Sequence, residues 1–362
     1  MPGIEYSSLG VNKLVNEVVF AGSHDAAITS GGGRAQTQKH GIYMQAWCGV
    51  RIFDIRISGQ RTGVTGSGAK LSAFHGSNTP STERKVFNGT KQDIEVTRMV
   101  GGAWGLDLDE ILSEAKRFVK EYDQEFLILK FDKSSNYEKI LDACDRGLGK
   151  RLYKKAGNIA EQTLGYMAGK VVCAFMPDGY GELQRAGYGI AQGVAQIVNL
   201  YGGGQHPGQV DGLIYYGKGG TSVAQPKKYA FSKPVDGKFQ QNIDKQSGIL
   251  DDAKQRNLGS DVMRMMYWTQ TGVVRSIKGR DEKAWTTGSV GKLRQLWAEG
   301  GYKEVKANAP QGLNLNSNAV NYQAYLPNFI MIDFANLHKG STIRKLNDLS
   351  RNDLIQLNAT LA

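Results

Sequence analysis

Three apolar, strand-like runs in the first quarter of the chain each end at a basic side chain. They lead into His24, into Arg56 and into His75. A charged group at a buried strand end costs free energy unless it has a partner, so three such ends in succession suggest that they share one polar site. The chain must therefore fold so that these strands finish close together, and strands that lie side by side with their ends at one edge satisfy this condition.

The runs belong to a longer alternation of β-rich apolar segments with helical or glycine-rich ones. The clearest helix begins near Asp107, with apolar residues from Leu108 to Val119 at three- and four-residue spacing. Such alternation is typical of a parallel sheet. The candidate strands are 17–21, 51–57, 70–75, 126–131, 170–176, 261–269 and 328–334, with an eighth near 229–232.

This number of strands favours a closed α/β barrel of the TIM (β/α)8 type, distorted or incomplete, over two separate domains. We expect one domain over residues 1–362. Segment 178–225 differs from the rest because it is rich in Gly and Tyr and keeps no period of 2 or 3.6 residues. We expect it to be a loop region inserted in the barrel, such as a lid or a surface that contacts a bilayer or a partner.

Composition narrows the partners of the chain. The formal net charge is +11, which suits an anionic lipid surface or a merely solvated basic surface. The basic residues are dispersed and no basic helix is interleaved with aromatics, so nucleic acid is not an expected partner. No apolar run approaches the 18 or so residues of a membrane span, and we expect a monomer.

The residue types at the strand ends suit phosphodiester cleavage. Without a metal, this reaction needs a base for the attacking hydroxyl, an acid for the leaving oxygen and a cation on the non-bridging oxygens. His24, His75 and Arg56 supply these groups, since an imidazole with a pKa of about 6.5 serves as either acid or base. Asp25 and Asp333 are candidates for the carboxylates that orient the two imidazoles.

Three segments resemble the motifs of one family. Residues 21–26 (AGSHDA), 49–56 (GVRIFDIR) and 74–77 (FHGS) are similar to motifs of the X domain of bacterial phosphatidylinositol-specific phospholipase C, in the same order and spacing. Residues 125–131, 169–172 and 329–334 resemble later strands of that family. The resemblance is strong before Gly76, weak in the middle of the chain and fair near Asp333.

The resemblance implies a set of roles. His24 would deprotonate the inositol 2-hydroxyl while Asp333 holds it, and His75 would protonate the diacylglycerol oxygen with support from Asp25. Arg56 would bind the phosphate. The expected products are diacylglycerol and a cyclic inositol phosphate, formed from phospholipid at a membrane surface without a metal or other cofactor.

The residues that would bind the headgroup are less clearly marked. Family members that prefer phosphatidylinositol carry a basic residue at the end of the fifth strand, where this chain has 175–178 (FMPD). Asp54 and Lys133 are candidates for substrate binding, with Asp244 and Tyr229 as further ring contacts. The identity of the headgroup therefore stays open.

Two other functions remain open. The first is a glycerophosphodiester phosphodiesterase or sphingomyelinase D-like enzyme that uses calcium or magnesium, although such sites need paired acidic ligands where this chain has Asp54 and Arg56. The second is a non-catalytic barrel that binds a membrane or a partner. Residues 1–6 lack the features of a secretory signal peptide, and the resemblance alone favours an extracellular enzyme or a delivered effector over a cytosolic protein.

Overall fold

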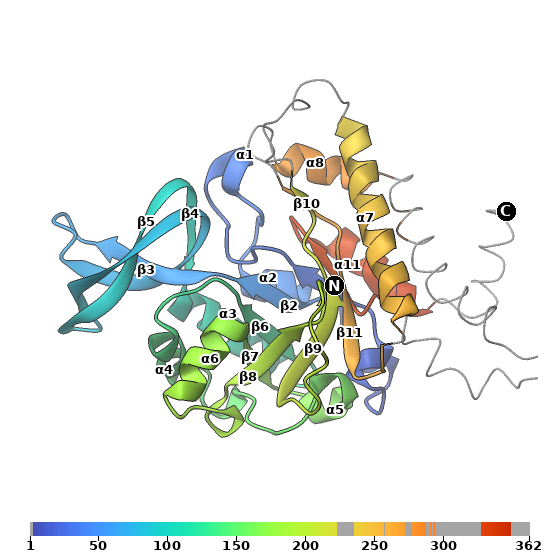
Figure 1. Cartoon of the computed structure of the whole chain (residues 1–362), viewed down its shortest axis with the longest axis horizontal. Helices are drawn as coiled ribbons and strands as arrows, with labels where there is room; N and C mark the ends of the chain where they lie inside the picture. Colours follow the sequence, from blue (N-terminus) through green and yellow to red (C-terminus); the bar gives the residue numbers. More distant parts are fainter. Residues whose placement is uncertain are drawn as a thin grey trace, which may run out of the picture.

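Eight parallel strands close into a barrel in the computed structural model, which describes residues 3–222, 235–256, 258–271, 277–286, 290, 293 and 327–348 (Figure 1). The strands follow one another around the barrel in chain order, and the last one pairs with the first. This confirms the predicted α/β barrel. The strands are β1 (Phe20–Ser23), β2 (Val50–Ile55), β6 (Leu127–Phe131), β7 (Val171–Phe175), β8 (Ala195–Asn199), β9 (Gly212–Gly217), β11 (Val262–Tyr267) and β13 (Phe329–Ile332).

Side chains alternate between the two faces of each strand. In β6, Ile128 belongs to the apolar cluster inside the barrel, whereas Leu127 and Leu129 belong to the cluster between the barrel and its helices. Both faces are buried, which explains why these strands read as continuous apolar runs in the sequence.

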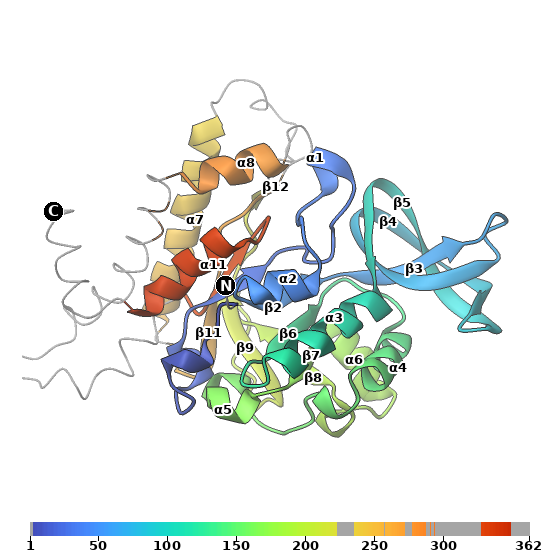
Figure 2. The same ribbon diagram turned by 180° about the vertical axis from the view of Figure 1, so that it is seen from behind.

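Helices cover the outside of the barrel (Figures 1 and 2). The predicted helix is confirmed as α3, which starts after Asp107 and buries the six apolar residues expected from the spacing. None of the described helices is both long and apolar enough to cross a membrane. The helices are α1 (Gly32–Ala35), α2 (Ile42–Trp47), α3 (Leu108–Glu121), α4 (Tyr137–Leu148), α5 (Leu164–Met167), α6 (Pro177–Arg185), α7 (Val235–Gln255), α8 (Ile277–Ala284) and α11 (Leu337–Arg344).

A second sheet replaces one of the predicted barrel strands. Residues 70–75 do not join the barrel but lie in β4 (Gly68–Phe87), which pairs antiparallel with β3 (Ile57–Thr62) and β5 (Thr90–Asp107). These strands project sideways from the barrel between β2 and α3 (Figures 1 and 2). The prediction failed because an apolar run of six residues does not reveal whether its partner strand is parallel or antiparallel.

The expected loop region at 178–225 is also corrected. It contains most of α6 and two barrel strands, β8 and β9, with turns rather than a helix between these strands. The short strand β10 (Thr221–Ser222) follows and pairs with β12 (Gln270–Thr271). The insertion in the barrel is therefore the sheet β3–β5, and the predicted strand at 229–232 lies outside the described residues.

Candidate active site

Period-two alternation along the barrel strands brings polar side chains to one end of the barrel. Phe20, Ile52 and Met331 lie in the interior apolar cluster, and the same face of each strand continues towards its carboxyl end. Because all eight strands are parallel, their carboxyl ends share one mouth. The interior positions that follow these three residues include His24 after β1, Asp54 and Arg56 at the end of β2, and Asp333 after β13.

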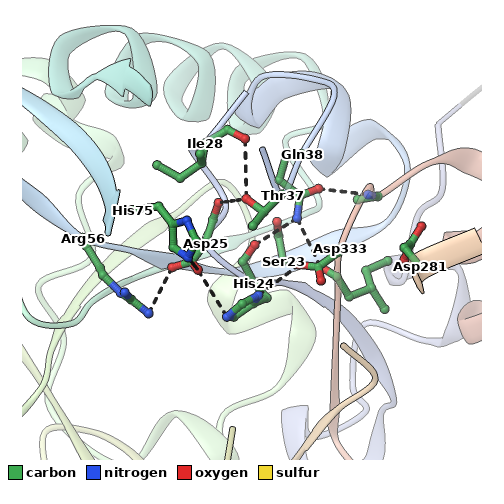
Figure 3. A network of polar contacts seen from close by, with 12 residues as sticks. Ser23, His24, Asp25, Ile28, Thr37, Gln38, Arg56, His75, Asp281 and Asp333 are labelled. Carbon is green, nitrogen blue, oxygen red and sulfur yellow. Dashed lines mark hydrogen bonds and ion pairs between the residues drawn. The ribbon is translucent and has the colours of Figure 1, made fainter. Parts of the chain in front are cut away.

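Asp25 lies at the centre of this mouth (Figure 3). Its Oδ2 is 3.4 Å from Nε2 of His24 and 3.4 Å from Nε2 of His75, and its Oδ1 is 3.2 Å from Nη2 of Arg56. Asp25 itself is buried. We call these four residues together with Asp333 the Asp25 cluster.

The second carboxylate of the cluster holds His24 from the other side. Oδ1 of Asp333 lies 3.0 Å from Nδ1 of His24, and the backbone N–H of His24 donates to the carbonyl of Ile332 at 3.0 Å. The amide of Gln38 donates to the carbonyls of both His24 and Ile332, while its Oε1 accepts from the N–H of Ala335. These contacts hold the ends of β1 and β13 together and orient the imidazole.

Asp25 adopts a left-handed backbone conformation, with φ of 42°, which non-glycine residues rarely adopt. Two hydrogen bonds to its carbonyl hold this conformation, one from Oγ1 of Thr37 at 2.7 Å and one from the N–H of Ile28 at 3.1 Å. The turn directs the side chains of His24 and Asp25 to the same site although they are neighbours in the chain.

The charges of the cluster shift the pKa values of its members. Burial lowers the pKa of His24, but the carboxylates of Asp25 and Asp333 raise it to about 9. Burial lowers the pKa of His75 below its ordinary value despite the opposing effect of Asp25. Burial raises the pKa of Asp25, but His24, Arg56 and His75 more than offset this, and the pKa is lowered overall. At neutral pH the free protein therefore carries a proton on His24, a neutral His75 and an ionised Asp25.

His75 reaches the cluster from β4 and not from a barrel strand. It pairs with Ala103 of β5, and the register of the two strands shifts just after it. Gly102 has φ of 88°, and a Cβ at this position would overlap the carbonyl oxygen of His75. The close approach of the two strands therefore requires glycine here.

A buried ion pair lies beside the cluster inside the barrel. Nζ of Lys130 is 2.8 Å from Oδ1 of Asp54 and 3.7 Å from Oδ2 of Asp132, and Lys130 and Asp54 face each other across β6 and β2. Burial lowers the pKa of Lys130, but Asp54, together with Tyr267, Tyr215 and Asp132, raises it well above its ordinary value. The ring of Tyr267 lies edge-on to His24, with 6.0 Å between the ring centroids.

The predicted substrate-binding residues lie in different parts of the structure. Asp54 lies inside the barrel beside the Asp25 cluster, where it pairs with Lys130. Lys133 is exposed beyond the end of β6. Asp244 is exposed on α7, and Tyr229 lies outside the described residues. The sequence analysis missed Lys130. The alternation from Ile128 to Lys130, parallel to that from Ile52 to Asp54, was the signal that could have found it.

Within the described ranges, no group of three or more His, Cys, Asp or Glu side chains is arranged to hold a metal ion. Two of the carboxylates at the mouth instead have cationic partners, since Asp25 contacts Arg56 and Asp54 contacts Lys130. Chemically, the arrangement provides two imidazoles and a guanidinium around one carboxylate, which can move protons and bind an anion.

Comparison with known proteins shows what the fold resembles. No protein-family model matches the sequence, and no curated protein matches it. The structure is similar to a phosphatidylinositol-specific phospholipase C from Listeria monocytogenes, with 13% identity over 95% of this chain and 97% of that chain and a TM-score of 0.50. A mutant of the phosphatidylinositol-specific phospholipase C from Staphylococcus aureus matches with 15% identity, 94% and 96% coverage and a TM-score of 0.46. The likeness to the Listeria structure shows that this chain has the same barrel fold.

Proposed function

We propose that the protein is a metal-independent phosphodiesterase of the phospholipase C type that cleaves a phosphatidylinositol-like phospholipid. The observation that carries this proposal is the Asp25 cluster, in which one buried carboxylate contacts His24, Arg56 and His75 while a second, Asp333, holds His24. The similarity of the fold to phosphatidylinositol-specific phospholipase C supports it.

The reaction begins with attack by a hydroxyl of the headgroup on its own phosphorus. His24 takes the proton of this hydroxyl, a bond forms between the hydroxyl oxygen and phosphorus, and the bond from phosphorus to the glycerol oxygen breaks. His75 gives a proton to that oxygen, which leaves as diacylglycerol. Arg56 binds the non-bridging oxygens, where negative charge develops. The phosphate product is cyclic.

The reactive complex carries its proton on His75, whereas the free protein carries it on His24, because Asp25 and Asp333 raise the pKa of His24 to about 9. One proton has to move from one imidazole to the other before turnover. Asp25 lies 3.4 Å from both imidazoles and stabilises a proton on either side. Only a fraction of the protein is then in the reactive protonation state at neutral pH.

The charges around the mouth support a reaction without a metal. A divalent cation needs several free carboxylate oxygens. The carboxylates of Asp25 and Asp54 have cationic partners in Arg56 and Lys130, which leaves Oδ2 of Asp333, the other carboxylate of the Asp25 cluster, as a single oxygen without a hydrogen-bond partner among the described residues. The Lys130–Asp54 pair provides both donors and acceptors inside the barrel, which suits the hydroxyls of a polyol headgroup.

The experiment is a headgroup panel. Vesicles of phosphatidylinositol, phosphatidylcholine or sphingomyelin are incubated with the protein in EDTA, and products are followed by phosphorus NMR. We expect a cyclic phosphate from phosphatidylinositol and no cleavage of the other two lipids. No cleavage of phosphatidylinositol, or cleavage that appears only when calcium or magnesium replaces EDTA, would overturn the proposal.

A further inference from the structure

Lys339 is a buried cation that the proposed reaction does not use. It lies on α11, the helix that follows β13, and only 4% of it is exposed. Its Nζ donates to Oδ2 of Asp281 on α8 at 2.5 Å and to the backbone carbonyl of Asp333 at 2.6 Å. Nζ also lies 5.4 Å from the centre of the Trp285 ring. One ammonium group therefore joins α8 to the residue that holds His24.

The Lys339–Asp281 ion pair by itself adds little to the stability of the fold. Burial raises the pKa of Asp281 to about 7 although Lys339 lowers it, and burial lowers the pKa of Lys339 although Asp281 raises it. Desolvation thus outweighs attraction for both partners. Oδ1 of Asp281 also has no hydrogen-bond partner among the described residues. A benefit other than the energy of the pair itself has to account for a charge buried at this position.

The contact with the carbonyl of Asp333 offers such a benefit. The next residue, Phe334, has a left-handed backbone with φ of 46°, and its N–H donates to the carbonyl of Thr37. The side chain of Asn336 then caps α11 by accepting from the N–H of Lys339. Lys339 thereby closes a tight turn whose first carbonyl belongs to Asp333.

The carboxylate of Asp333 depends strongly on this turn. Its Oδ1 contacts His24, but its Oδ2 has no hydrogen-bond partner within the described part of the chain. The orientation of the carboxylate is therefore set by the backbone from which it projects. Figure 3 shows Asp333 between His24 on one side and Asp281 on the other.

We propose that the Lys339–Asp281 pair is a positioning device that holds the backbone of Asp333 so that its carboxylate meets Nδ1 of His24. Lys339 and Asp281 are positioning residues and do not touch the substrate. The kinetic consequence of this role rests on the proposed function, whereas its effect on His24 does not.

The first test measures the pKa of His24 by NMR in protein with labelled histidine and without substrate. The variant Lys339→Met/Asp281→Leu replaces the pair by apolar side chains, so the net charge near His24 is unchanged to first order. We expect the pKa of His24 to fall by about one unit, because a loosened Asp333 no longer stabilises the imidazolium fully. The variant Asp333→Asn removes the carboxylate itself, so the fall in the pKa of His24 in this variant is the largest that a misplaced Asp333 can cause.

Lys339→Met alone is a second variant, which removes the donor to the carbonyl of Asp333 together with the positive charge. Loss of a positive charge by itself raises the pKa of the imidazole, so a fall in the pKa of His24 in this variant reports on geometry. The matched control is Arg344→Gln/Asp348→Asn, which removes an ion pair between the half-buried Arg344 at the end of α11 and the exposed Asp348. We expect this control to leave both the pKa of His24 and the turnover unchanged.

The second test measures turnover of phosphatidylinositol. We expect kcat of the Met/Leu variant to fall about tenfold with little change in KM, as for other residues that orient a catalytic group. A folded variant with the wild-type pKa of His24 and the wild-type kcat would overturn the inference. If wild-type protein cleaves no lipid but the pKa of His24 still falls in the variant, the proposed function fails and the positioning role stands.

Discussion

At the scale of single residues, Asp25 organises the site. Its carboxylate faces His24, Arg56 and His75 at 3.2 to 3.4 Å, and its left-handed backbone is held by hydrogen bonds to its own carbonyl. Strain of this kind persists only where the surroundings enforce it, and it is common at functional sites. The two imidazoles therefore differ in proton affinity because Asp333 as well as Asp25 contacts His24, whereas burial lowers the pKa of His75 despite the effect of Asp25.

The proposed acid and base should each be required for turnover. We expect His24→Ala and His75→Ala each to lower kcat by about 10²-fold to 10⁴-fold, the usual range for loss of a general acid or base, while the far-UV circular dichroism spectrum stays unchanged. His338→Ala is the matched control, because His338 is exposed at the start of α11. Either variant with a rate within twofold of wild type would remove that histidine from the mechanism.

At the scale of elements, the inserted hairpin is part of the site. β4 and β5 leave the barrel between β2 and α3, and the end of this hairpin next to the barrel carries His75 into the mouth. The backbone at this end of the hairpin has an unusual conformation, since Gly76, Gly101 and Gly102 all have positive φ. The hairpin thus supplies a catalytic candidate that no barrel strand supplies.

A methyl group on Gly102, at the end of the hairpin next to the barrel, should displace His75. Gly102→Ala forces a Cβ against the carbonyl oxygen of His75, and we expect a loss of kcat of about 10²-fold because the imidazole moves off its position. Gly89→Ala is the control, since Gly89 also has positive φ but lies in open space at the hairpin turn. Equal activity in the two variants would show that the close approach of β4 and β5 at Gly102 does not position His75.

The sequence predicted the elements that carry a strong local pattern. Of the eight predicted strands, six lie in the barrel, the one at 70–75 lies in the hairpin, and the one near 229–232 lies outside the described residues. α3 follows its apolar spacing residue by residue. β8 and β9 were missed because the glycine-rich composition of the whole segment concealed them. β8 is interrupted by Gln196 and ends at Asn199, and the apolar residues of β9 are bounded by Gly212 and Gly217.

At the scale of the whole molecule, buried groups with raised pKa values link folding to pH. The pKa of His24 is raised from 6.5 to about 9, so its contribution to stability is full below pH 6.5 and is lost as pH rises through about 9. Asp281 acts in the same direction, since its pKa is raised from 3.8 to about 7. Both groups make the folded protein less stable as pH rises.

We expect the free energy of unfolding to fall between pH 6.5 and pH 9.5, with a contribution from His24 on the order of 3 kcal/mol. Urea unfolding at these two pH values measures it. His24→Gln should show a smaller fall than wild type, and His338→Gln should show the wild-type fall. A fall as large in His24→Gln as in wild type would exclude His24 as the linked group.

Local patterns in the sequence determined that this chain forms a parallel barrel and that polar residues follow β1, β2 and β13, because apolar runs and their flanking residues are contiguous in the chain. Only the tertiary structure decided that His75 arrives on an antiparallel hairpin, that the register of β2 and β6 sets Lys130 opposite Asp54, and that Lys339 lies between Asp281 and Asp333. These contacts depend on strand partners, register and helix packing between distant segments, which no local pattern encodes.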